Sequence, residues 1–186
     1  MRSTSLTSPA PRALSPVLPT RLRPADLLHI TDRGADDVLS GRYDDLLPPG
    51  ERWPHDRRWA ARLESDDELD LWLISWVPDK STQLHDHAGS LGALTVLSGA
   101  LSEYRWAGSQ LRHRTLLAGD QAAFPIGWVH DVMRSASPVV GPAEPTLSVH
   151  AYSPPLTAMS YYEVTSRSTL RRTHTVLTDQ PEGDLE

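Results

Sequence analysis

Three histidines form the sequence pattern with the clearest chemical meaning. His85 and His87 flank Asp86. Side chains two apart in an extended segment point to one face, so both imidazoles can reach one metal ion while Asp86 points away. A third histidine, His130, follows a bend shaped by the proline and glycine of 125–127 and lies on a further predicted strand. Side chains from different strands can converge inside a barrel, and we therefore expect His85, His87 and His130 to bind one divalent metal ion.

A second pattern lies farther along the chain. Ser148, His150 and Tyr152 alternate with Val149 and Ala151, so in a strand all three polar side chains face the same way. Polar groups on an inward face need hydrogen-bond partners. We expect the three to bond to one another, with the tyrosine hydroxyl at the end of the row aimed into the site. No G-x-S-x-G elbow accompanies Ser148, which argues against a hydrolase nucleophile.

The composition excludes several classes of function. The chain has 186 residues, enough for one domain with a full core. Its net charge of −6 argues against a nucleic-acid partner, and no stretch approaches the roughly 20 apolar residues of a membrane span. The chain contains no cysteine, which excludes disulfides, thiolate ligands and a cysteine nucleophile. Its amino terminus lacks the apolar core of a signal peptide, and we expect a cytoplasmic protein.

The elements that must position these residues are mainly short strands. Sixteen prolines and eleven glycines favour turns over long helices. Residues 1–22 and 179–186 are predicted tails, the second acidic, around a single domain at 23–178. One or two short helices are predicted within 24–41, broken near Gly34, and a further helical piece within 59–63. The predicted strands lie at 69–77, 92–97, 101–106, 111–117, 121–124, 128–133, 146–152 and 159–164. This spacing favours a closed barrel or a sandwich.

Two blocks of the sequence resemble the two motifs of the cupin superfamily, G-x5-H-x-H-x3,4-E-x6-G and G-x5-P-x-G-x2-H-x3-N. The matching residues are His85, His87 and Gly99 in the first block and Gly119, Pro125, Gly127 and His130 in the second. The resemblance implies a mainly-β fold, a single cupin jelly-roll β-barrel with short N-terminal helices. Three positions depart from the motifs, with Asp79 for the first glycine, Gly92 for the glutamate ligand and Arg134 for the asparagine. The implied metal site therefore has no acidic fourth ligand.

A closer resemblance is to the thiol dioxygenases, in particular the cysteine dioxygenase type I family. It rests on residues 81–87 and 97–103, and most strongly on Ser148–Pro155, which is similar to that family's S-x-H-x-Y-S-P-P segment. The family typically carries a cysteine that cross-links to its active-site tyrosine. Here Gly92 stands at the matching place and the chain has no cysteine, so no such cross-link forms.

The resemblance implies a reaction and a role for each residue. One Fe(II) per chain would bind to His85, His87 and His130, and a small-molecule thiol would be oxidised by O2 to its sulfinic acid. Three neutral imidazoles leave the full charge of the metal ion in place, which favours an anionic, chelating substrate. The catalytic residues implied are Tyr152, His150 and Ser148.

The substrate carboxylate would need a cation. The resemblance implies an arginine before the first motif, and Arg62 is our first candidate and Arg58 the second. Arg62 and Tyr152 would then bind the substrate. In the branch that prefers 3-mercaptopropionate a glutamine replaces this arginine, so the presence of Arg62 favours L-cysteine.

Several alternatives stay open on the sequence alone. The substrate could be 3-mercaptopropionate, or the protein could be a non-catalytic ligand-binding or regulatory cupin, or an enzyme using another metal such as nickel or manganese. The oligomeric state is open, a monomer included. Trp72 and Trp76 are interpreted as core or barrel-wall residues, as is Trp128, for which lining of the pocket is the alternative. The histidines outside any motif are interpreted as surface or packing residues; they are His29, His55, His113 and His174.

Overall fold

The protein is built from short strands and one long helix. The structure, a computed structural model, describes residues 20–48, 54, 57–135 and 145–181. The helices in this part are α1 (Pro24–Leu39) and the 3-10 helix η1 (Asp44–Leu46). The strands are β1 (Trp59–Ser65), β2 (Asp70–Trp76), β3 (His85–Asp86), β4 (Leu91–Ser98), β5 (Ala100–Trp106), β6 (Leu111–Leu117), β7 (Gln121–Phe124), β8 (His130–Arg134), β9 (Thr146–Ser153), β10 (Ala158–Val164) and β11 (Leu170–Leu177).

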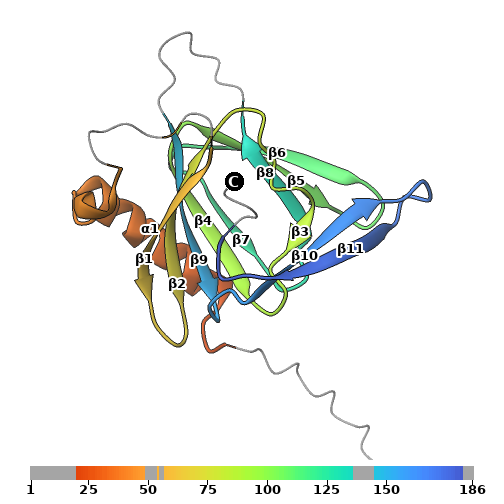
Figure 1. Cartoon of the computed structure of the whole chain (residues 1–186), viewed down its shortest axis with the longest axis horizontal. Helices are drawn as coiled ribbons and strands as arrows, with labels where there is room; N and C mark the ends of the chain where they lie inside the picture. Colours follow the sequence, from red (N-terminus) through yellow and green to blue (C-terminus); the bar gives the residue numbers. More distant parts are fainter. Residues whose placement is uncertain (1–19, 49–53, 55–56, 136–144, 182–186) are drawn as a thin grey trace, which may run out of the picture.

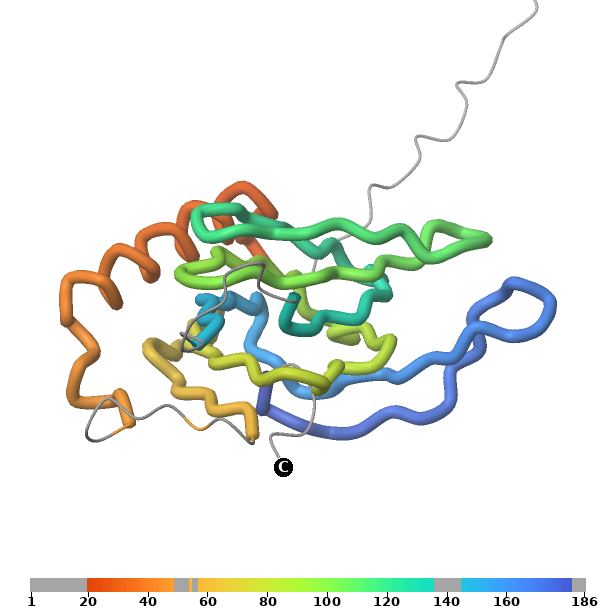
Figure 2. Tube along the Cα trace, turned by 90° about the horizontal axis from the view of Figure 1, so that it is seen from above, coloured from red at the N-terminus to blue at the C-terminus, as the bar shows by residue number. Residues whose placement is uncertain are grey.

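The strands form two antiparallel sheets that face each other as a barrel (Figure 1). The order in the five-stranded sheet is β1-β2-β9-β4-β7, and in the six-stranded sheet it is β11-β10-β3-β8-β5-β6. Strands far apart in sequence therefore become neighbours, above all β3 and β8. Seen from above, α1 lies on one side and the β10–β11 hairpin extends on the other (Figure 2). The two-sheet barrel confirms the predicted mainly-β fold.

Helix α1 begins where the sequence supplies helix-start signals. Pro24 lies in its first turn, and the backbone N–H of Arg23 donates to Asp26 Oδ2 at 2.7 Å. The proline removes one orphan N–H group of the helix N-terminus, and the hydrogen bond to Asp26 satisfies another. The helix covers the outer face of the five-stranded sheet, where Leu27 and Leu71 belong to one buried cluster.

Strand β2 is buried along its whole length. Trp72, Ile74 and Trp76 belong to the cluster inside the barrel, while Leu71 and Leu73 belong to the cluster beneath α1. A strand covered on both faces reads as a continuous apolar run, which is how this segment appears in the sequence. Alternate residues of β2 therefore form one wall of the barrel interior.

Two predictions about the elements are wrong, and strand β11 was missed. Helix α1 continues through Gly34, where a Cβ would come within 2.9 Å of Leu71 Cδ2, so the glycine allows the helix to pack closely on the sheet rather than ending it. Residues 59–63 belong to strand β1, because they pair in antiparallel register with β2. Strand β11 is absent from the predicted set, since its side chains are mostly exposed and give no apolar alternation.

Most of both predicted tails lies outside the described residues. Within 1–22 the structure describes residues 20–22, where Thr20 Oγ lies 2.6 Å from Ser153 Oγ. Within 179–186 it describes residues 179–181. The division into a tail, a domain at 23–178 and an acidic tail stays a prediction. Among the described helices, none is long and apolar enough to cross a membrane.

Candidate metal centre

The three histidines predicted as ligands meet inside the barrel. His85 pairs directly with His130 across β3 and β8, and His87 follows β3. One nitrogen from each ring lies within 4.8 Å of the others. The exposed fractions are 0% for His85, 4% for His87 and 0% for His130. Three imidazoles this close and this buried form a donor set that can hold a divalent metal.

Hydrogen bonds fix which nitrogen of two rings faces the centre. His85 Nδ1 lies 2.9 Å from the carbonyl oxygen of Gln83, whose backbone has a φ of 62°. A carbonyl can only accept, so Nδ1 carries the proton and Nε2 carries the lone pair. His130 Nδ1 lies 3.1 Å from Glu103 Oε1, and the same reasoning leaves the lone pair on its Nε2. Such a second contact orients a metal-binding histidine.

Glu103 is a buried carboxylate behind His130. It is 1% exposed, and it accepts hydrogen bonds from His130, from Trp128 Nε1 at 3.0 Å and from the guanidinium of Arg114. Burial alone raises the pKa of Glu103, but its interactions with His130, Trp128 and Arg114 lower it to about 2. The carboxylate is therefore ionised, and it holds the proton of the His130 ring on Nδ1.

Gly92 makes room for the His87 ring. A Cβ at this position would lie 3.0 Å from His87 Nδ1 and 3.1 Å from Phe124 Cδ2, which is tighter than ordinary contact. The position where the cupin motif has its glutamate is thus filled by neighbouring rings. The three-histidine donor set follows from this packing as well as from the sequence.

Asp86 points away from the three histidines, as the alternation predicts. Its Oδ2 accepts a hydrogen bond of 2.7 Å from Tyr162 Oη, and its Oδ1 accepts one of 3.0 Å from the backbone N–H of Ala88. Burial, and then the hydrogen bond to Asp86, raise the pKa of Tyr162. Asp86 is therefore engaged in holding the turn after β3 and the neighbouring strand β10.

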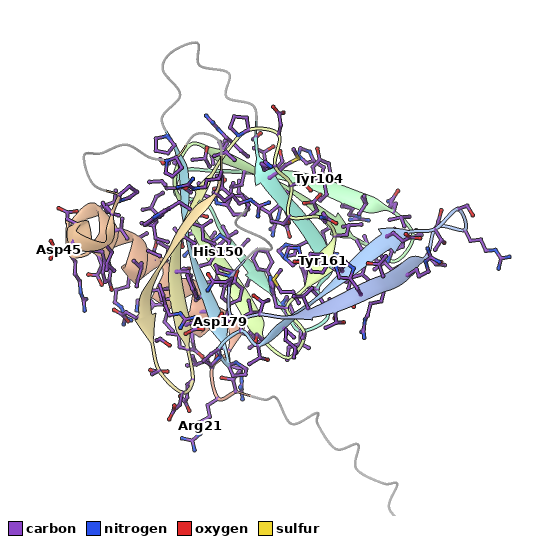
Figure 3. All side chains as sticks on the ribbon, in the orientation of Figure 1. Arg21, Asp45, Tyr104, His150, Tyr161 and Asp179 are labelled. Atoms are coloured by element: carbon purple, nitrogen blue, oxygen red, sulfur yellow. The ribbon has the colours of Figure 1, made fainter. Side chains whose placement is uncertain are left out.

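Ser148, His150 and Tyr152, which we call the polar row, lie side by side on the inner face of β9. Ser148 Oγ is 2.8 Å from His150 Nε2, and His150 Nδ1 is 3.3 Å from Tyr152 Oη. All three are 0% exposed. The Tyr152 ring centroid lies 5.0 Å from that of His87, so the row ends beside the candidate metal centre. Figure 3 shows His150 between the two sheets.

Trp76 extends the polar row at its other end. Its Nε1 donates to Ser148 Oγ at 2.8 Å, and both groups are buried. An indole N–H can only donate, so Ser148 accepts from Trp76 and shares its remaining hydrogen-bonding capacity with His150. Four groups therefore form one continuous chain of hydrogen bonds across the interior.

The family model of cysteine dioxygenase type I matches residues 54–165 of this chain. The chain belongs to this family. The matched segment contains all three histidines, the polar row and Gly92, and it spans β1 to β10. Cysteine dioxygenases of type I are metal-dependent, and the buried histidines of this chain can bind a metal.

Several solved structures are similar to part of this chain. KdgF from Halomonas sp. is 15% identical, and the match covers 60% of this chain and 91% of that chain with a TM-score of 0.46. A cupin superfamily protein from Desulfitobacterium hafniense DCB-2 is 11% identical over 55% of this chain and 82% of that chain, with a TM-score of 0.44. An oxalate oxidase is 12% identical over 62% of this chain and 60% of that chain, with a TM-score of 0.48. These similarities are too distant to bear on activity.

Arg62 and Arg58, the two candidates for binding a substrate carboxylate, lie on the inner side of the five-stranded sheet. Arg62 pairs with Trp72 across β1 and β2, and its guanidinium carbon lies 4.5 Å from the Trp72 ring centroid. Its Nη2 donates to Asp179 Oδ2 at 2.8 Å. Arg58 is 7% exposed, lies over the Trp76 ring at 5.3 Å and donates to the Ser81 carbonyl at 2.6 Å.

The Arg62 guanidinium already holds a carboxylate of the same chain. The hydrogen bond from Arg62 lowers the pKa of Asp179, so this carboxylate is ionised. Asp179, which Figure 3 labels, belongs to the segment that follows β11. Arg62 can therefore bind a carboxylate.

Sequence reasoning missed Glu103 and the role of Trp76. Leu101, Glu103 and Arg105 alternate along one predicted strand, so an inward Leu101 places an acidic and a basic side chain on the same inner face. Charged side chains on an inward face are unexpected in an apolar core, and this pattern could have indicated a role for Glu103. Trp76 fits the predicted wall residue, but nothing in its spacing indicates its hydrogen bond to Ser148.

Proposed function

We propose that this protein is a non-haem iron(II) thiol dioxygenase that converts L-cysteine and O2 into the sulfinic acid. The overall change is R–SH + O2 → R–SO2H, in which both oxygen atoms are transferred to sulfur and no external reductant is required. The observation that carries the proposal is the position of Tyr152, which ends a buried hydrogen-bonded row and lies 5.0 Å from His87 between ring centroids. A cupin that only binds a ligand has no need for such a row.

His85, His87 and His130 would hold one iron(II) per chain through their Nε2 atoms. When bound, the iron supplies a positive centre at which a thiol ionises and meets O2. The hydrogen bonds from His85 to Gln83 and from His130 to Glu103 keep these two rings in the required tautomer. The protein thus presents preorganised neutral donors and a net positive site to an anionic substrate.

Tyr152 would donate its hydroxyl proton as a hydrogen bond to the reacting groups. His150 holds the tyrosine oxygen at 3.3 Å, and Ser148 holds the other nitrogen of His150 at 2.8 Å. Because the row is buried, water does not compete for its hydrogen bonds, and the three side chains stay oriented. Tyr152 would therefore contact the substrate or oxygen, while His150 and Ser148 would orient the hydroxyl.

Arg62 would bind the carboxylate of the thiol substrate, with Arg58 as the alternative. A guanidinium fork suits a carboxylate and would select L-cysteine over a thiol without an acidic group. Asp179 would be displaced from Arg62 when the substrate enters. An arginine at this place is the reason for preferring L-cysteine to 3-mercaptopropionate. The cytoplasmic location stays a prediction.

Oxygen consumption by the iron(II)-loaded protein tests the proposal. L-Cysteine, 3-mercaptopropionate and cysteamine are offered separately, and the product is identified by mass spectrometry. We expect about one O2 per thiol and a sulfinate product, with L-cysteine as the preferred substrate. A preference for 3-mercaptopropionate would correct the substrate but not the reaction. Absence of uptake with every thiol, in protein shown to contain iron, would contradict the proposal and favour a ligand-binding cupin.

A further inference from the structure

A cavity of about 220 Å³ lies against the six-stranded sheet, next to Glu103, the carboxylate that holds His130. It is lined by three arginines, a tryptophan, a glutamate and a histidine, namely Arg105, Arg112, Arg114, Trp128, Glu103 and His113. The cavity lies over β5 and the edge strand β6. Its strongly basic lining contrasts with the net charge of −6 of the chain.

The strand register places two of these arginines in line with a metal ligand. Arg105 is directly opposite Arg112 on β6 and directly opposite His130 on β8. Directly opposed residues of antiparallel strands share a face, and neighbouring strands are about 4.8 Å apart. The cavity is therefore one strand away from the ligand His130.

Arg105 and Arg112 repel each other in this arrangement. Like charges directly opposite each other destabilise a sheet. In the part of the chain that the structure describes, neither guanidinium has a carboxylate within 4.0 Å, whereas Arg114 pairs with Glu103. Arg105 instead lies over the Trp128 ring, 4.1 Å from its centroid. Arg112 is exposed and Arg105 is half-buried, so solvent screens part of this repulsion, and an anion between the two guanidinium groups would offset the rest.

We propose that this cavity binds a small oxyanion between Arg105 and Arg112. Two guanidinium forks can each donate paired N–H groups to the oxygens of a carboxylate, sulfinate or sulfate. The Trp128 ring forms a flat wall that keeps the Arg105 fork in place. The volume equals the share of about seven water molecules, which suits an inorganic oxyanion or a short organic acid.

The anion would lie next to the hydrogen bonds that orient His130. Trp128 supports Arg105 and also donates to Glu103 at 3.0 Å, and Glu103 in turn holds His130. This site is distinct from Arg62, which lies on the opposite sheet. Its existence does not depend on the proposed reaction, because binding can be measured without iron and without thiol.

Isothermal titration calorimetry on the metal-free full-length chain tests this site. Inorganic sulfate and L-cysteinesulfinate are titrated in separate experiments. The proteins are the wild type, the double variant Arg105→Gln/Arg112→Gln and the control Arg171→Gln. Arg171 is an exposed arginine of β11 that pairs with Glu163. We expect one anion per wild-type chain, unchanged affinity in the control and at least about tenfold weaker binding in the double variant. Tighter binding of cysteinesulfinate would identify an organic acid as the ligand, and equal binding an inorganic oxyanion.

Thermal unfolding separates loss of the site from loss of the fold. Sulfate should raise the melting temperature of wild type and of Arg171→Gln but not that of the double variant, because only a folded site binds it. In low-salt buffer without oxyanions, Arg112→Gln alone should melt at the same temperature as wild type or higher, since the repulsion is removed. Equal affinity in wild type and double variant, or no binding of either anion to wild type, would overturn the proposal.

Discussion

Gly92 lies directly opposite Tyr152 across the antiparallel pair of β4 and β9. A Cβ on Gly92 would approach His87 Nδ1 to 3.0 Å. The absence of a side chain at Gly92 therefore has two consequences. It leaves space for the ring of His87, a candidate metal ligand, and it leaves Tyr152 without a covalent partner. Tyr152 is then oriented through hydrogen bonds alone, by His150 and the groups behind it.

Replacing Gly92 with alanine should weaken metal binding. The added methyl group must displace the His87 ring or Phe124, and disturbances around a ligand histidine typically cost about tenfold or more in metal affinity. Competition with a chromophoric chelator measures the affinity. Gly89→Ala is the matched control, because a Cβ there meets no atom within 4 Å. Equal affinity in both variants would show that the space beside His87 is not required.

Replacing Tyr152 with phenylalanine should lower turnover while the metal stays bound. The variant keeps the ring and loses the hydroxyl, and a lost hydrogen bond of about 1.5–3 kcal/mol to the reacting groups corresponds to about 10- to 100-fold in rate. Steady-state oxygen uptake and iron content are measured together. Tyr104→Phe serves as the control, since Tyr104 packs on His113 away from the polar row. Wild-type turnover of the Tyr152 variant would remove the hydroxyl from the proposed reaction.

Glu103 should stabilise the metal-free fold at neutral pH and lose that effect in acid. Its pKa is about 2 in the folded protein against an ordinary 4.5, so the ionised carboxylate favours folding above pH 4.5 and this contribution falls between pH 4.5 and about 2. The advantage of wild type over Glu103→Gln should shrink by about 1 kcal/mol from about pH 6 to about pH 3.5. Urea unfolding at both pH values measures the difference, and a constant gap would contradict the lowered pKa.

The sequence predicted the pairing of His85 with His87 and the polar row because both depend on local alternation. The two-residue spacing of His85 and His87, and that of Ser148, His150 and Tyr152, holds in any extended segment. That spacing does not determine which strands become neighbours. The bend before His130 and the resemblance to cupin motifs placed this histidine with the other two.

The errors and omissions have a different cause. Gly34 looked like a helix breaker, whereas tertiary packing against Leu71 uses its missing side chain. The arginine cavity arises because Arg105 and Arg112 meet across a hairpin in one particular register, and register cannot be read from either strand alone. The pairing of Arg62 with Asp179 joins residues 117 apart in sequence, so no local pattern could indicate it.

Replacing Arg62 with glutamine should raise the KM for L-cysteine but not for cysteamine. Loss of a charge-assisted contact of about 1.5–3 kcal/mol corresponds to about 10- to 100-fold weaker binding of the carboxylate. Cysteamine has no carboxylate and provides the control within the same variant. Arg58→Gln is tested in parallel, because a selective effect in that variant would transfer the assignment to Arg58.

Replacing Asp179 with asparagine should lower the KM for L-cysteine, which is the opposite of the effect expected for Arg62→Gln. In the wild type the Asp179 carboxylate accepts a 2.8 Å hydrogen bond from Arg62, so a substrate carboxylate must compete with it for the guanidinium. The neutral amide competes less, and the KM for L-cysteine should fall while that for cysteamine stays constant. Asp67→Asn, at an exposed turn between β1 and β2, controls for the change in net charge. The Arg62 side chain is 35% exposed and that of Asp179 is 65% exposed, so salt screens part of their attraction. The difference in KM between variant and wild type should therefore narrow as ionic strength rises. A KM that is unchanged at low salt would show that Asp179 does not compete with the substrate.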